Sequence, residues 1–215
     1  MPAPISLPDF FESLRIEAGY RFYLPGLRQH SRTRGGEVLT SVLGRPLWQG
    51  TVTAIAKSRP ETAALQAMIE DIDQTGKPFL VRSMPGCAPA ADPNGALILT
   101  ATPTILEVMP DNTRLQITGL PVGYRLQRGD FLSFMYGSDP VRFALHRITN
   151  ALSVAGPEGG ATVSLAPHIR PGATVGTAVR FHRPICKAVI VPDSISWPDY
   201  TGMGRVSFDF IQTLR

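Results

Sequence analysis

The chain has 215 residues, 43% of them hydrophobic and 18% charged, and a mean hydropathy of +0.04. These values are typical of a soluble globular protein, built as one large all-β unit or two small domains, with some apolar surface left for a subunit interface. The sequence predicts no membrane span, because no window of it approaches the roughly 18 apolar residues that a bilayer requires. The net charge of +4 and the pI near 9.4 are common in nucleic-acid binders, but here the basic residues are not interleaved with aromatic ones.

The first elements are short. Residues 8–14 predict a brief helix with an acidic start that Asp9 could cap. Residues 20–24 are extended, and residues 26–36 are interpreted as a polar loop. This loop holds the only dense basic run, from Arg28 to Arg34, which is interpreted as a solvated loop or as an electrostatic contact with DNA or a partner subunit.

A half-buried strand follows at residues 47–56. Trp48, Val52, Ala54 and Ala56 alternate with polar residues, so they share one face of the strand. Trp48 is therefore expected to anchor the core of a sheet rather than to stack on a ligand.

One helix is clear, over residues 60–75. Ser58 and Glu61 have the spacing of a capping box, Pro60 suits the first turn, and Gly76 can end the helix. An apolar stripe predicts that the helix covers one side of a sheet, and it consists of Leu65, Met68, Ile69 and Ile72. The other face is acidic and is expected to be solvated.

Short strands separated by glycine and proline make up the rest of the chain, which contains 20 residues of each type. The predicted strands before the middle segment are residues 77–82 and 96–100. Within residues 102–181 they are 105–108, 115–120, 130–136, 143–148, 162–165 and 178–181. Residues 187–192 and 205–211 then return to the first sheet. The fold class is therefore mainly β, a sandwich or barrel with one flanking helix. Residues 1–101 and 182–215 are expected to form one discontinuous domain, into which residues 102–181 insert a small barrel-like domain.

No residue pattern indicates a catalytic, cofactor or metal site. The four histidines have no metal-binding spacing, and His146 is expected to be a hydrogen-bonded barrel residue. The serines have no recognisable base partner, and paired acids such as Asp71 with Asp73, or Asp92 with Asp111, show no sign of a sugar cleft. The residues considered were His30, His146, His168, His182, Cys87, Ser31, Ser133, Ser164, Asp71, Asp73, Asp92, Asp111, Asp130 and Asp193.

The two cysteines, Cys87 and Cys186, are expected to be reduced and packed, as in a protein folded in a bacterial cytoplasm, although a single disulfide between them is possible. The N-terminus lacks the basic and apolar regions of a signal peptide.

Several motifs together resemble a tail protein of long-tailed phages and prophages, including those of alphaproteobacteria such as the roseobacters. They include Phe181-His-Arg-Pro-Ile-Cys-Lys-Ala and Ser31-Arg-Thr-Arg-Gly-Gly-Glu, with further segments at residues 46–50, 120–134, 145–148, 167–172 and 206–215. The resemblance implies a distal tail protein with a tail-tube-like fold. It also implies a homohexameric ring in the virion tail tip, between the tail tube and the hub or baseplate, with residues 102–181 projecting outward.

Two alternatives stay open at this point. The chain could be another hub component of the tail tip with a different copy number. It could instead be a carbohydrate-binding module for host surface glycans, whose aromatic platform would come from Trp48, Trp197, Tyr136 or Tyr200.

Overall fold

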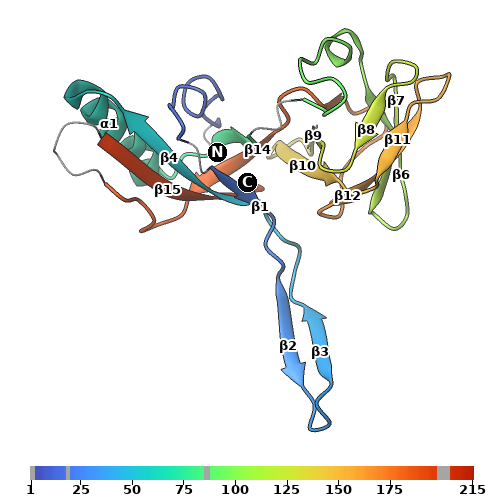
Figure 1. Ribbon diagram of the computed structural model, residues 1–215, viewed down its shortest axis with the longest axis horizontal. Coiled ribbons are helices and arrows are strands. Elements are labelled where there is room, and N and C mark those ends of the chain that lie inside the picture. Colours follow the sequence, from blue (N-terminus) through green and yellow to red (C-terminus); the bar gives the residue numbers. More distant parts are fainter. Residues whose placement is uncertain (1–2, 18–19, 85–87, 198–203) are drawn as a thin grey trace.

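The computed structural model describes residues 3–17, 20–84, 88–197 and 204–215. It confirms a mainly β protein with one α-helix in its described part. Two β structures lie side by side, and a long hairpin projects from the region between them (Figure 1).

The first structure is a five-stranded antiparallel sheet in the order β1-β4-β15-β14-β5. Its strands are β1 (Arg21–Tyr23), β4 (Gln49–Ala56), β5 (Phe79–Arg82), β14 (Ile185–Ile190) and β15 (Gly204–Gln212). The predicted alternation of β4 is confirmed, because every second residue from Gly50 to Ala56 is buried. β15 pairs with β4 along its length, so the C-terminal strand returns to the first sheet as expected.

The helix α1 (Arg59–Thr75) covers one side of this sheet and contacts β4 and β15. Its predicted caps are confirmed: Ser58 accepts a hydrogen bond from the Glu61 amide, and Gly76 has a left-handed φ of 58°. The predicted buried stripe was wrong for Met68, which is 37% exposed. The buried face is instead centred on Thr62, Ile69 and Ile72, because Thr62 lies directly over the side-chain-free Gly204.

The second structure is a six-stranded antiparallel barrel in the order β13-β9-β10-β12-β7-β6. Its strands are β6 (Thr104–Val108), β7 (Arg114–Thr118), β9 (Phe131–Tyr136), β10 (Arg142–Ile148), β12 (Ala161–Ala166) and β13 (Val179–Arg180). The barrel closes where Thr104 bridges Ala178 and the Val179 amide donates to the Pro103 carbonyl at 2.8 Å. All six strands occur where the short segments between glycines and prolines predict them.

A short ribbon that the sequence interpretation missed lies on the barrel. It pairs β8 (Arg125–Gln127) with β11 (Leu152–Val154), and Leu126 in its centre is fully buried. These strands are only three residues long, too short for a period of two to be recognised.

Three local predictions were wrong. Residues 8–14 form irregular turns rather than a helix, and these turns bury both Phe10 and Phe11. Residues 96–100 form no strand but contain the 3₁₀ turn η1 (Ile98–Thr100), because the Asp92 carboxylate accepts the Leu97 and Ile98 amides. Residues 26–36 are no loop, because they carry the first strand of the projecting hairpin.

The sheet and the barrel meet around Trp48. Its indole Nε1 donates to the Leu145 carbonyl at 2.7 Å, and its ring lies 5.5 Å from that of Phe131. Trp48 is 1% exposed, which confirms its expected role as a core anchor and extends that role to the junction. The sheet strands come from residues 21–82 and 185–212 and the barrel strands from residues 104–180, but their folding as separate domains stays a prediction.

Candidate assembly interface

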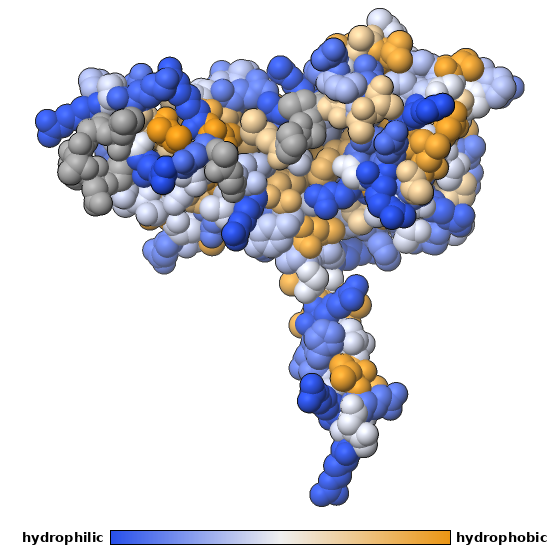
Figure 2. Space-filling view, viewed as in Figure 1, coloured by the Kyte–Doolittle hydropathy of each residue, from blue (hydrophilic) through white to orange (hydrophobic). Residues whose placement is uncertain are grey.

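The projecting hairpin is the most unusual surface of the molecule. β2 (Arg28–Arg32) and β3 (Val38–Val42) pair with each other, joined by a turn in which Gly36 has a φ of 85°. We call residues 27–43 the arm. Figure 1 and Figure 2 show that it extends away from the body, and every residue of both strands is exposed.

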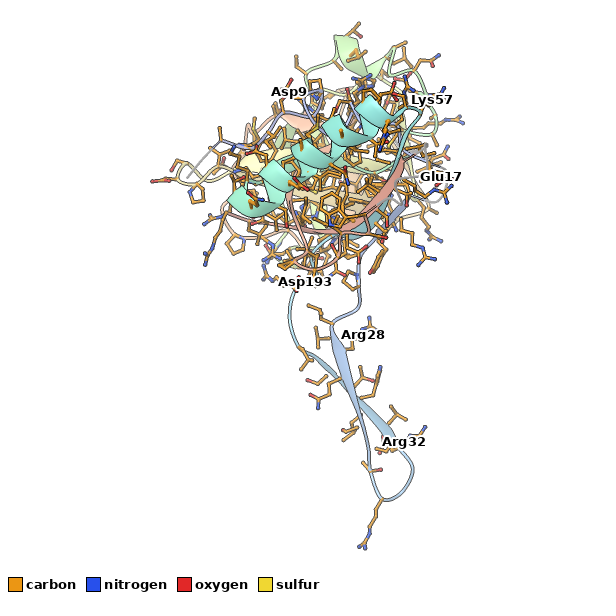
Figure 3. The ribbon with its side chains drawn as sticks, turned by 90° about the vertical axis from the view of Figure 1, so that its left-hand side faces the viewer. Asp9, Glu17, Arg28, Arg32, Lys57 and Asp193 are labelled. Atoms are coloured by element: carbon orange, nitrogen blue, oxygen red, sulfur yellow. The ribbon has the colours of Figure 1, made fainter. Side chains whose placement is uncertain are left out.

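One face of the arm is basic and apolar at once. Arg28, His30 and Arg32 alternate along β2, so their side chains share a face. Residues that pair directly across an antiparallel ribbon also share a face. The cross-strand partners of these three residues are Val42, Thr40 and Val38. We call these six residues the basic face; Figure 3 shows Arg28 and Arg32 at the side of the arm, clear of the body.

Among the described residues, none of the arm belongs to either hydrophobic cluster of the body. An isolated two-stranded hairpin is marginally stable in water, because it lacks a buried apolar face. The arm nevertheless exposes Val42 by 70% and Val38 by 52%, next to two arginines. Its outer edges carry no further strand in the described part of the chain, so their backbone groups can pair with another chain. An exposed apolar surface rimmed by charge is typical of a protein contact.

The histidines considered as catalytic or metal-binding residues lie apart in the fold. His30 is on the arm, His168 is exposed after β12, and His182 follows β13. His146 is buried in β10, where its Nδ1 lies 2.8 Å from the Pro167 carbonyl, so its expected structural role is confirmed. Burial lowers the pKa of His146 to about 4, which keeps the ring neutral. Among the described residues, no three metal-binding side chains come together.

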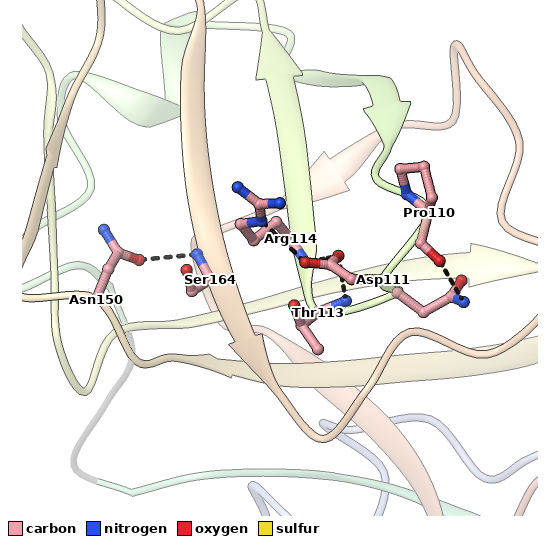
Figure 4. A network of polar contacts seen from close by, with 7 residues as sticks. Pro110, Asp111, Thr113, Arg114, Asn150 and Ser164 are labelled. Carbon is pink, nitrogen blue, oxygen red and sulfur yellow. Dashed lines mark hydrogen bonds and ion pairs between the residues drawn. The ribbon is translucent and has the colours of Figure 1, made fainter.

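Two further candidates, Asp111 and Ser164, belong to hydrogen-bonded turns and strands (Figure 4). Asp111 accepts the amides of Thr113 and Arg114 and pairs with the Arg114 guanidinium at 2.9 Å. These hydrogen bonds lower the pKa of Asp111 to about 2, the Thr113 amide having the largest effect. The Ser164 amide donates to Asn150, and its strand pairs with β7.

Asp92, Asp130 and Ser133 also have structural partners. Asp92 caps the η1 turn, and the Asp130 carboxylate accepts the amides of Ala90 and Gln127. Ser133 accepts the Ile185 amide across the junction of sheet and barrel. Asp71 and Asp73 are exposed on α1, as expected for its solvated face, and Ser31 is exposed on the arm.

The aromatic candidates for glycan binding divide by exposure. Trp48 and Tyr136 are buried and cannot present a flat platform to a sugar. Trp197 is 42% exposed and keeps that possibility open. Tyr200 lies outside the described residues.

Cys186 is a free thiol, fully buried in β14, and burial raises its pKa. Cys87 lies outside the described residues.

Comparison with known proteins adds no identification, because no family model and no curated protein matches this sequence. In the described part of the chain, no helix is long and apolar enough to cross a bilayer.

The arm was missed because its strands have no buried face to mark them. A signal existed in the sequence: Arg-x-His-x-Arg and the β-branched run Val38–Val42 flank Arg34-Gly-Gly-Glu, which is a turn composition.

Proposed function

We propose that this chain is a structural subunit of a phage tail tip, a distal tail protein that assembles as a ring and joins the tail tube to the hub or baseplate. The resemblance of its motifs to phage tail proteins, its mainly β fold with one helix, and the arm support this proposal. Its partners are further copies of itself, six by family analogy, and the neighbouring tube and hub proteins. It is assembled in the bacterial cytoplasm, it resides in the virion, and DNA touches it only in transit through the lumen.

The arm is the observation that carries the proposal. A ribbon with two exposed valines and unpaired outer edges gains stability only when another chain covers it. In a ring, each subunit donates one surface and receives a different one from its neighbour. A projecting arm suits such a head-to-tail contact. The protein accordingly acts as a scaffold, without a catalytic site, cofactor or metal.

Assembly is tested by comparing the complete chain with an arm-deleted variant, in which a short Gly/Ser linker replaces residues 28–42. Mass photometry and negative-stain electron microscopy should show closed rings for the complete chain and monomers for the variant. Circular dichroism should show that the variant keeps its fold, because no arm residue belongs to either hydrophobic cluster. A complete chain that stays monomeric at high concentration and is absent from purified virions contradicts the proposal. Rings of another copy number favour a hub component.

Glycan recognition is kept as a second candidate function because Trp197 is exposed. A glycan array with the wild type and a Trp197→Ala variant tests it. Glycan binding that the substitution abolishes supports a module for host surface sugars. A wild type that binds no glycan on the array contradicts that function.

A further inference from the structure

One flank of α1 is acidic and apolar, whereas the arm is basic and apolar. Glu61, Ala64, Met68 and Asp71 follow each other at helical spacing and are all exposed. We call these four residues the α1 stripe. It places a carboxylate near each end and apolar side chains between them. Beside the stripe lies a shallow hollow of about 290 Å³, whose lining includes Leu14, Ile55 and Leu65.

The dimensions of the two surfaces match. Arg28 and Arg32 are four strand residues apart, which corresponds to about 13 Å. Glu61 and Asp71 are ten helical residues apart, which corresponds to about 15 Å. The two arginines of the basic face can therefore lie opposite the two carboxylates of the α1 stripe. The valines beside the arginines would then face Ala64 and Met68, which lie between the carboxylates.

The charges of the two segments also complement each other. The chain from Gly26 to Arg45 contains four arginines and one glutamate, whereas α1 contains one arginine and four acidic residues. The stripe carboxylates already have partners, since Glu61 lies 3.8 Å from Arg15 and Asp71 lies 3.3 Å from Lys77. Both pairs are solvent-exposed and therefore weak, so they can be exchanged for contacts with an arriving arm.

The contact has to join two copies. The arm leaves the sheet just before Gln49, and α1 begins just after Ala56, so they start from opposite ends of β4. The arm then extends away from the body, whereas α1 lies on it (Figures 1 and 3). An arm therefore cannot reach its own helix, and a second copy is the partner that carries the complementary stripe.

We infer that the basic face of one copy binds the α1 stripe of the next copy. This inference rests on the proposed ring, and it names the receiving surface of that ring. The contact is head-to-tail, which leads to closure when the angle between subunits is fixed. Because its charges lie at an exposed surface, added salt should weaken it.

Charge substitutions on both surfaces test the inference. An arm variant, Arg28→Glu/Arg32→Glu, and a helix variant, Glu61→Gln/Asp71→Lys, should each raise the concentration of half-assembly about tenfold or more, because like charges then face each other or attraction is lost. Glutamine is chosen at position 61 because it preserves the capping box. A chain with all four substitutions should recover part of its assembly. Analytical ultracentrifugation at low and high salt gives these values.

The matched control is Glu70→Gln/Asp73→Lys, which makes the same charge change on α1 away from the stripe. It should assemble like the wild type. Equal losses of assembly in the control and the helix variant would show that net charge alone causes the effect, and this would overturn the inference. Wild-type rings that tolerate all these substitutions would also overturn it while leaving the proposed function intact, whereas a monomeric wild type contradicts the proposed function itself.

Cross-linking provides a second measurement that does not depend on charge. A Val42→Cys/Met68→Cys chain treated with a short bis-maleimide should form covalent ladders, and the single variants, which keep the natural cysteines, should not. Fluorescence anisotropy with duplex DNA completes the test. DNA binding that the arm variant loses, combined with unchanged self-association, would assign the basic face to nucleic acid and overturn the inference.

Discussion

The described part of the molecule contains two antiparallel two-stranded ribbons, of which one, β8–β11, has a core beneath it and the other, the arm, does not. The β8–β11 ribbon lies on the barrel, with Leu126 fully buried and the Ser153 hydroxyl bonded to the Thr162 carbonyl. The arm has the longer strands, yet all of its strand residues are exposed. The length and strand propensity of a ribbon therefore do not decide whether it packs against the rest of its own chain. Contacts with the barrel complete the first ribbon, and we expect another chain to complete the second.

Removing the barrel should have the largest effect. Replacing residues 102–181 with a Gly/Ser linker deletes the packed ribbon together with the core that supports it. The two ends of this segment lie close together, since Thr104 bridges Ala178, so the linker need not stretch the remaining sheet. We expect a less stable protein that still pairs β4 with β15 and keeps the arm. Hydrogen exchange checks this outcome, and loss of protection in both strands would contradict the two-domain organisation.

A matched leucine pair compares the ribbons directly. Leu126→Ala should lower the free energy of unfolding by about 2–5 kcal/mol, because it leaves a cavity under β8. Leu39→Ala on the arm should change it by less than about 0.5 kcal/mol, because Leu39 is 51% exposed. Urea unfolding of the monomer measures both. Similar losses would show that the arm packs against the body in solution.

The stability of the barrel should depend on pH through His146. The folded protein holds the pKa of His146 near 4, below its ordinary value of 6.5. The neutral ring is therefore favoured by folding: its contribution is complete above pH 6.5 and is lost as the pH falls towards 4, by up to about 3 kcal/mol. Unfolding measured across this range should show the loss, and a His146→Gln variant should show less of it. The His30→Gln variant on the arm is the control and should behave like the wild type.

The smallest effect is local. Arm amides should exchange rapidly in the monomer and become protected in the ring, while the amides of β8 and β11 should be protected in both. Mass spectrometry of peptides from residues 27–43 measures this difference. Equal exchange in monomer and ring would show that the arm lies outside the contact.

The sequence predicts those elements in which apolar, buried residues recur at the regular spacing of a strand or a helix. β4 and α1 were recognised because one side of each is apolar. The burial of Thr62 over Gly204 is a contact that no helical pattern contains. Trp48 was recognised as a core residue, but its partner Leu145 is 97 positions away along the chain. The η1 turn follows from the Asp92 carboxylate, and the arm has no buried face at all. Long-range contacts and fully exposed strands are therefore the parts that pattern reading misses.

Closure of the barrel limits where this protein can aggregate. A strand in a closed barrel has both neighbours occupied, so the bridge between Thr104 and Ala178 removes the edges on which foreign strands could grow. The arm remains as an open template, and its run Val38-Leu-Thr-Ser-Val has the β-branched composition of aggregation-prone segments. Arg28 and Arg32 stand directly opposite Val42 and Val38, where repulsion between like charges opposes uncontrolled stacking of arms. In the assembly proposed above, the arginines would act as gatekeepers that keep newly made subunits apart until the acidic stripe of another copy arrives.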